Sequence, residues 1–92
     1  MHWKLFADLA ERAGTTEVEV APEASEPTVG DALEALFAEC PALEDRVLDA
    51  DGAVRSHLNL LKNGEDVTHG EGLSTPVGAE DELALFPPVS GG

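Results

Sequence analysis

The residues best placed to do chemistry are Gly91 and Gly92, because they carry a carboxylate on backbone that has no side chains. Glycine lacks a Cβ, so such backbone can enter a channel too narrow for any other residue. Just before them, Pro87 and Pro88 fix φ at about −65° and favour an extended path. The six residues from Pro87 to Gly92 therefore predict an arm that reaches about 20 Å at most. We interpret the Gly92 carboxylate as a reactive group meant for another protein's active site.

The rest of the sequence offers no catalytic triad, metal-ligand cluster or phosphate-binding loop. Its only cysteine, Cys40, falls on the apolar stripe of an expected helix, where a free thiol acts as a small hydrophobe. Three histidines, His2, His57 and His69, are widely spaced and lack carboxylate or thiol partners at ligand spacing. We therefore predict neither a catalytic site nor a metal site, and the protein is not expected to be an enzyme.

Composition limits the partners of this 92-residue chain, a length that suits one domain. Nineteen acidic residues face five basic ones, and the net charge of −14 would repel nucleic acid and anionic membranes. Two explanations of the acidity stay open: adaptation to molar salt, and an acidic surface that steers docking onto a basic partner. With no long apolar run, no leader pattern and a single cysteine, we expect a cytoplasmic protein without a disulfide.

Strict alternation of apolar and polar residues predicts the strands that must position the arm. In the first strand, residues 3–7, the side chains of Trp3, Leu5 and Ala7 share one face and Phe6 takes the other. The remaining strands are expected over 16–20, 56–62, 65–68 and 82–86. The strands over 3–7 and 16–20 are close enough in sequence to pair as a hairpin. Asn63 and Gly64 tolerate positive φ, so they predict a tight turn between the third and fourth strands.

Helical spacing of apolar residues predicts one main helix. Thr28 is a good N-cap, and Asp31 stands three residues later as in a capping box. The apolar stripe ends at Cys40, and Pro41 stops the helix. A short helical turn is expected over 8–13, and 42–47 and 69–80 are expected to be irregular. The order β-β-α-β-β-β predicts an α+β fold: a mixed sheet of four or five strands packed on one helix, spanning 1–86, with a flexible tail over 87–92.

This order and the ending Leu85-Phe86-Pro87-Pro88-Val89-Ser90-Gly91-Gly92 resemble the β-grasp family of ubiquitin-like sulfur carriers. Within it, the chain is similar to small archaeal modifier proteins and to the small subunit of molybdopterin synthase. The segments 3–7, 28–33 and 81–86 carry the same resemblance. The acidity and the scarcity of lysine favour the archaeal, salt-adapted branch.

The resemblance implies that the Gly92 carboxylate is adenylated by a ubiquitin-activating-type enzyme, which uses ATP. The mixed anhydride would react with a sulfur donor to give a thiocarboxylate, or with a lysine amine of a target protein to give an isopeptide bond. Neither step needs a side chain of this protein. We predict no stably bound cofactor, and as partners the activating enzyme, target lysines and the molybdopterin synthase large subunit. The free protein is expected to be a monomer.

We keep one other class of function beside this one, a non-covalent β-grasp interaction module whose tail is never activated. Within the leading prediction, sulfur transfer and protein conjugation share one acyl-adenylate, and we expect the chain to serve both. Lys4 and Lys62 are its only lysines, and two interpretations of them stay open: they are ordinary solubilising residues, or they are the positions at which copies of the protein are joined into chains.

A partner-binding surface follows from the expected strand order, in which the first and last strands lie side by side next to the third. Leu58, Leu60, Leu83 and Leu85 then face the helix, whereas Phe6, Leu61 and Phe86 gather on the uncovered face. Clusters of exposed apolar side chains mark partner sites. We expect this cluster, with Pro87, Pro88, Val89 and Ser90, to dock the activating enzyme.

Overall fold

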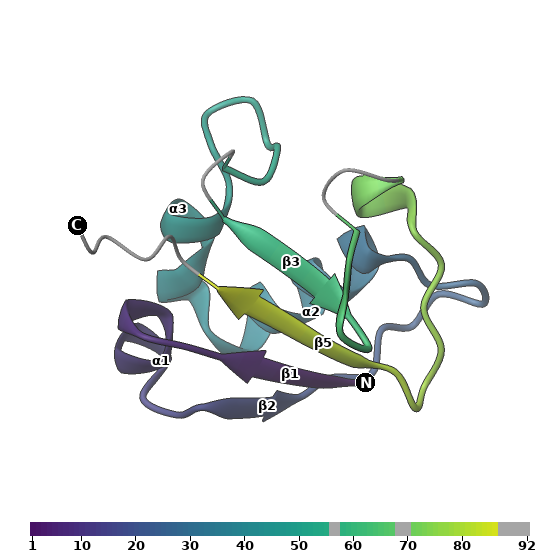
Figure 1. Cartoon of the computed structure of the whole chain (residues 1–92), viewed down its shortest axis with the longest axis horizontal. Helices are drawn as coiled ribbons and strands as arrows, with labels where there is room; N and C mark the ends of the chain where they lie inside the picture. The colour runs from purple at the N-terminus through teal and green to yellow at the C-terminus, as the bar shows by residue number, and fades with distance from the viewer. Residues whose placement is uncertain (56–57, 68–70, 87–92) are drawn as a thin grey trace.

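The computed structural model describes residues 1–55, 58–67 and 71–86, and it forms a five-stranded sheet in the order β2-β1-β5-β3-β4 (Figure 1). The strands are β1 (His2–Leu5), β2 (Glu17–Glu19), β3 (Asn59–Lys62), β4 (Glu65–Asp66) and β5 (Glu82–Phe86). β1 and β5 run parallel at the centre, whereas the other neighbouring strands pair antiparallel. The expected placement of the first and last strands beside the third is confirmed.

The alternation in the strands sets which side chains are buried. Trp3 and Leu5 of β1 and Leu83 and Leu85 of β5 are at most 2% exposed and face the helix side of the sheet. The expectation for Ala7 is wrong, because β1 ends at Leu5 and Ala7 is exposed at a φ of 54°. This turn starts the short helix α1 (Asp8–Ala13), whose Leu9 enters the core instead.

Helix α2 (Val29–Glu39) covers the inner face of the sheet and begins as the sequence predicts. Thr28 Oγ1 accepts a hydrogen bond from the Asp31 amide, and the Asp31 carboxylate accepts one from the Thr28 amide at 2.9 Å, which completes the capping box. Four apolar side chains of the expected stripe are buried: Val29, Leu33, Leu36 and Phe37. The helix ends just before Pro41, as expected.

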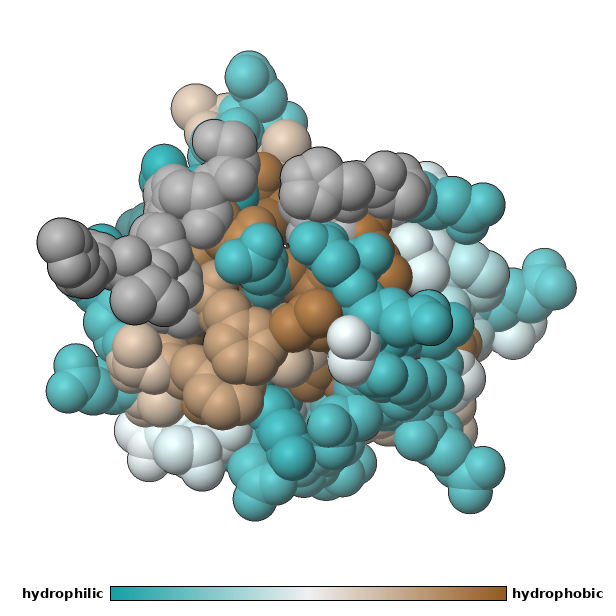
Figure 2. Space-filling view, in the orientation of Figure 1, coloured by the Kyte–Doolittle hydropathy of each residue, from teal (hydrophilic) through white to brown (hydrophobic). Residues whose placement is uncertain are grey.

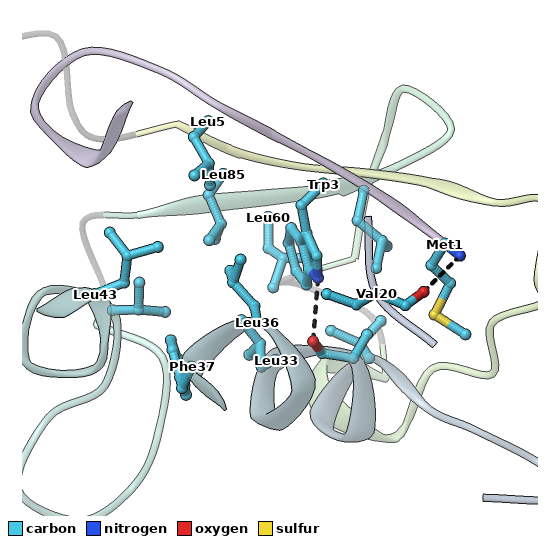
Figure 3. Packing of buried hydrophobic residues seen from close by; sticks show 14 of the residues in the cluster. Met1, Trp3, Leu5, Val20, Leu33, Leu36, Phe37, Leu43, Leu60 and Leu85 are labelled. Carbon is cyan, nitrogen blue, oxygen red and sulfur yellow. Dashed lines mark hydrogen bonds between the residues drawn. The ribbon is translucent and has the colours of Figure 1, made fainter. Parts of the chain in front are cut away.

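The core lies between the sheet and α2, around the indole of Trp3 (Figure 3). Trp3 is completely buried, and its Nε1–H donates a hydrogen bond to the carbonyl of Ala32 at 3.1 Å. This bond joins β1 directly to α2 because the donor belongs to one element and the acceptor to the other. At the edge of the same core, the amino group of Met1 donates to the carbonyl of Val20 at 2.9 Å.

Two segments expected to be irregular contain helical turns. A 3-10 turn over Pro41–Leu43 (η1) leads into α3 (Glu44–Val47), and both Leu43 and Val47 are fully buried. A second 3-10 turn, η2 (Gly72–Ser74), packs on the start of α2. A Cβ added to Gly30 would stand 3.4 Å from the Leu73 carbonyl, at the lower limit of ordinary van der Waals contact, so η2 lies directly against this turn of α2.

The expected tight turn is confirmed, since Asn63 and Gly64 both have positive φ, 50° and 86°. It connects β3 to the two-residue strand β4, which pairs with β3 through Leu61 and Lys62. The whole is the α+β β-grasp arrangement that the sequence predicts: one mixed sheet on one main helix. No helix in the described part of the chain is long and apolar enough to cross a bilayer.

Candidate functional site

The arm that carries the expected reactive group follows directly from the central strand β5. That strand ends at Phe86, between β1 and β3, and the next residue is Pro87. The candidate residues Pro87, Pro88, Val89, Ser90, Gly91 and Gly92 lie outside the described residues. What the structure contributes is their point of departure, the end of β5, where the side chain of Phe86 lies on the outer face of the sheet, away from α2.

An apolar patch occupies this outer face at the point of departure. The rings of Phe6 and Phe86 stack with centroids 4.2 Å apart and planes inclined by 13°. Their contact follows from the register, in which Leu5 pairs with Leu85 and the next residues of the two parallel strands lie side by side. Phe6 is 37% exposed, and among the described residues it is the large hydrophobic side chain most open to solvent.

Leu61 extends the patch on the neighbouring strand. It pairs with Ala84 of β5, which in turn pairs with Lys4 of β1. In a sheet, residues two apart on a strand share a face, so Leu61 and Ala84 lie on the same face as Phe86. Figure 2 shows this apolar area in the middle of the outer face, with hydrophilic residues to its right and below it. We call Phe6, Leu61, Ala84 and Phe86 the outer patch; Ala84 was not among the residues predicted, although β5 alternation could have supplied it.

The two lysines differ in how firmly the structure holds them. Lys62 Nζ donates to the carbonyl of Pro76 at 2.8 Å and lies 3.7 Å from Asp81 Oδ2, with 28% of the side chain exposed. Lys4 lies on the outer face with 42% of its side chain exposed, and its Nζ stands 3.5 Å from Glu82 Oε2. Of the two expected acceptor positions, Lys4 is therefore the more open.

Asp81 fixes the surroundings of Lys62 in a way that sequence patterns do not reveal. Its carboxylate accepts hydrogen bonds from the Gly78 amide at 2.7 Å and from Asn63 Nδ2 at 3.0 Å. The bond from Asn63, then the Gly78 amide and the nearby Lys62 ammonium, lower the pKa of the Asp81 carboxyl. This arrangement connects the β3–β4 turn to the segment before β5, across 18 positions of sequence.

Two titratable side chains outside the outer patch, Cys40 and His2, are held by contacts with neighbouring residues. Cys40 is half-buried at the end of α2 and packs against the core, and burial, assisted by the charge of Glu39, raises the pKa of its thiol. His2 lies between two carboxylates, with Nε2 2.7 Å from Glu17 Oε1 and Nδ1 2.7 Å from Glu19 Oε1. These bonds, first that to Glu17, raise the pKa of the His2 imidazole.

A raised pKa favours a thiol over a thiolate, so Cys40 is not activated as a nucleophile. Among residues 1–55, 58–67 and 71–86, no three His, Cys, Asp or Glu side chains are grouped so as to hold a metal ion. His57 and His69 fall outside these ranges.

Comparison with known proteins gives matches over essentially the whole chain. The model of the ThiS family matches residues 3–92. Small archaeal modifier protein 1 of Haloferax volcanii is 55% identical over 92 residues, covering all of both chains. The crystal structure of SAMP1 from the same organism superposes with a TM-score of 0.90 at 54% identity, covering 100% of this chain and 98% of that one.

A more distant structure extends the likeness of the fold. A chain in the crystal structure of the Amycolatopsis orientalis BexX/CysO complex gives a TM-score of 0.85 at 23% identity, with 99% of this chain and 98% of that one covered. At that identity the likeness concerns the fold alone.

Proposed function

Because the chain belongs to the ThiS family of ubiquitin-like modifiers and sulfur carriers, we propose that its working group is the carboxylate of Gly92. The protein is a carrier and modifier of the small archaeal modifier type and not a catalytic enzyme. The observation that supports the proposal most directly is the match of the family model through to residue 92, on a fold whose central strand leads into the Gly-Gly arm. Residues 1–86 serve as the folded body and 87–92 as the extended arm.

Activation at Gly92 is a chemical necessity for either role. The charge of a free carboxylate repels nucleophiles, and oxide is a poor leaving group. Carriers of the ThiS family are adenylated by E1-like enzymes. In the proposed reaction an oxygen of the Gly92 carboxylate attacks the α-phosphorus of ATP, the P–O bond to pyrophosphate breaks, and an acyl-adenylate forms. ATP is bound by the activating enzyme and not by this chain.

Two nucleophiles compete for the acyl-adenylate. A sulfide equivalent displaces AMP and leaves a thiocarboxylate, which supplies sulfur to the large subunit of molybdopterin synthase. The ε-amine of a lysine on a target protein displaces AMP and leaves an isopeptide bond. The same activated carboxyl group serves both roles, so the family resemblance and the chemistry agree without any added catalytic group. Since the reaction consumes ATP, we place it in the cytoplasm. In this proposal the free protein is a monomer.

The outer patch is the docking site for the activating enzyme in this proposal. Phe86 ends β5, and the arm beyond it spans about 20 Å at most, so an enzyme that holds Gly92 must come close to Phe86 and its neighbours. The ring pair of Phe6 and Phe86 and the half-buried Leu61 offer apolar contact at that distance. Pro87, Pro88, Val89 and Ser90 then follow the same enzyme surface toward its ATP site. The net charge of −14 favours an enzyme whose rim is basic.

A non-covalent interaction module makes the opposite prediction about Gly92. Deleting this residue shortens the arm and removes the terminal glycine without touching residues 1–86. A modifier then loses its conjugates and its sulfur transfer, because the carboxylate no longer reaches the ATP site. An interaction module keeps its partners. A Glu34→Ser variant, which changes an exposed residue of α2 and leaves the whole arm intact, serves as the matched control.

The direct test is mass spectrometry of the protein from its native host. We expect a fraction of the chain to carry sulfur in place of one terminal oxygen, and Gly-Gly remnants on lysines of other proteins. Detection of only the unmodified carboxylate, together with full function of the Gly92 deletion, would refute the proposal.

A further inference from the structure

We propose that Lys4 is the site at which a second copy of this protein is attached, and that the attachment closes the outer patch of the modified copy. The inference rests on the proposed activation at Gly92 and adds a regulation of the same site. The chain has two lysines, Lys4 and Lys62, and both belong to the described residues. The choice between them follows from their contacts.

Lys62 is held in place by groups that are themselves fixed. To attack an acyl group, its amine must lose a proton, free its lone pair and rotate toward the reagent. Its hydrogen bond to the Pro76 carbonyl, at 2.8 Å, and its ion pair with Asp81, at 3.7 Å, both oppose this movement. Asp81 is anchored in turn by Gly78 and Asn63.

Lys4 meets a smaller obstacle. Its side chain is 42% exposed, and its recorded ion pair, to the 49% exposed Glu82 at 3.5 Å, is a surface contact that water replaces readily. The Glu82 carboxylate stands where it can accept the proton that the amine gives up. In the reaction, the Lys4 nitrogen bonds to the Gly92 carbonyl carbon of another copy, the C–O bond to AMP breaks, and AMP and one proton leave.

The position of Lys4 gives the attachment its effect. Lys4 pairs with Ala84 of the outer patch, and Phe6, just beyond the end of β1, is the next residue on the same face of the sheet. The donor's arm of six residues spans about 20 Å at most, so the donor's body is held beside this face, in the space that an activating enzyme would need. The modified copy keeps its own Gly92, but an activating enzyme can no longer reach its outer patch. Joining two copies therefore limits further activation.

A reconstituted reaction tests the choice of lysine. The chain is incubated with the host's activating enzyme and ATP, once with hydroxylamine to trap the acyl-adenylate and once without it. We expect hydroxamate at Gly92 in the first sample and a linked dimer in the second. Relative to the unchanged chain, the ratio of dimer to hydroxamate should fall at least tenfold for Lys4→Arg and change less than twofold for Lys62→Arg. Arginine retains the positive charge at each position and removes the primary amine that forms the isopeptide bond.

The outcomes separate this inference from the proposal on which it depends. Absence of hydroxamate in every sample would refute activation at Gly92 and the inference with it. If hydroxamate forms, activation at Gly92 stands. The inference about Lys4 is then refuted by any of three results: dimers linked at Lys62, a ring closed onto Lys4 of the same copy, or no dimers. Labelling by an amine-reactive ester, which needs no enzyme, must modify Lys4 at least several-fold faster than Lys62.

A second measurement tests the closing of the outer patch. In a Cys40→Ser background, Lys4→Cys or Lys62→Cys is coupled through its thiol to a maleimide at the C-terminus of another copy. We expect the copy coupled at Lys4→Cys to form hydroxamate at least tenfold more slowly than the uncoupled chain. The copy coupled at Lys62→Cys must form hydroxamate within twofold of the rate of the uncoupled chain. Equal rates for the two coupled copies would refute the regulatory role.

Discussion

Replacement of Phe6 by serine should weaken activation of the protein while leaving its fold in place. Phe6 follows β1, outside the core, and 37% of its surface is exposed. An aromatic side chain can bury about 200 Å², so roughly 75 Å² of Phe6 is free for a partner. At about 25 cal/mol per Å², its burial contributes about 2 kcal/mol to docking.

That free energy converts to a measurable kinetic change. About 2 kcal/mol corresponds to a KM for the carrier about 25-fold higher in the Phe6→Ser variant. The kcat should change little, because the patch contacts the enzyme equally before and during adenylation. The assay is ATP–pyrophosphate exchange by the activating enzyme over a range of carrier concentrations.

Two comparisons make the result interpretable. Loss of the stack between Phe6 and Phe86 should cost the fold about 1 kcal/mol, which urea unfolding measures separately. Glu34→Ser changes an exposed residue of α2, on the other side of the sheet, and should leave KM within twofold. If Phe6→Ser also stays within twofold of the original KM while folded, the outer patch is not the docking site.

Three further predictions concern the folded body. Because contacts to Glu17 and Glu19 raise the pKa of His2, its protonation stabilises the fold at pH values below about 6.5, and this contribution disappears as pH rises through the folded-state pKa. His2→Gln should therefore abolish part of the loss in unfolding free energy that wild type shows as the pH rises above about 6.5. Trp3→Phe should cost about 2 kcal/mol, lowering Tm by about 10 °C, because it leaves a cavity and removes the bond to Ala32. At −14, the chain should be partly unfolded in about 20 mM salt and should become compact in about 2 M salt, as followed by circular dichroism.

Each of these three predictions has its own contradicting result. Equal pH slopes of wild type and His2→Gln would show that the imidazole is not linked to folding. An unchanged Tm for Trp3→Phe would contradict the cost assigned to the buried bond. Folding that is equally complete at both salt concentrations would count against self-repulsion as the main consequence of the acidity.

Elements with a simple period could be predicted from the sequence. The alternation around Trp3 and Leu83 defined the central strands, and Thr28 with Asp31 defined the start of α2, because each signal depends on neighbours within a few residues. An irregular turn was expected over 42–47, but its helical geometry was missed, since Leu43 and Val47 are too few to establish a helical period. Their burial is a consequence of where the segment packs.

The candidate site divides in the same way. The stack of Phe6 on Phe86 follows from strand order and alternation, so the family resemblance and the pattern together predicted it. The difference between the lysines could not be foreseen, because it depends on Asp81 and on the carbonyl of Pro76, 14 positions from Lys62. Such contacts arise only when distant loops meet.

The central position of β5 also constrains how the protein is made. A ribosome releases the chain from its N-terminus, yet His2 of β1 pairs with Glu82, which is synthesised near the end. Until β5 emerges, β1 and β3 have no common neighbour and the indole of Trp3 has no complete enclosure, so folding must wait for translation to pass Phe86. A chain interrupted earlier stays open to proteases. Every folded copy has therefore been translated as far as the start of its arm, and the topology itself serves as a check on completeness.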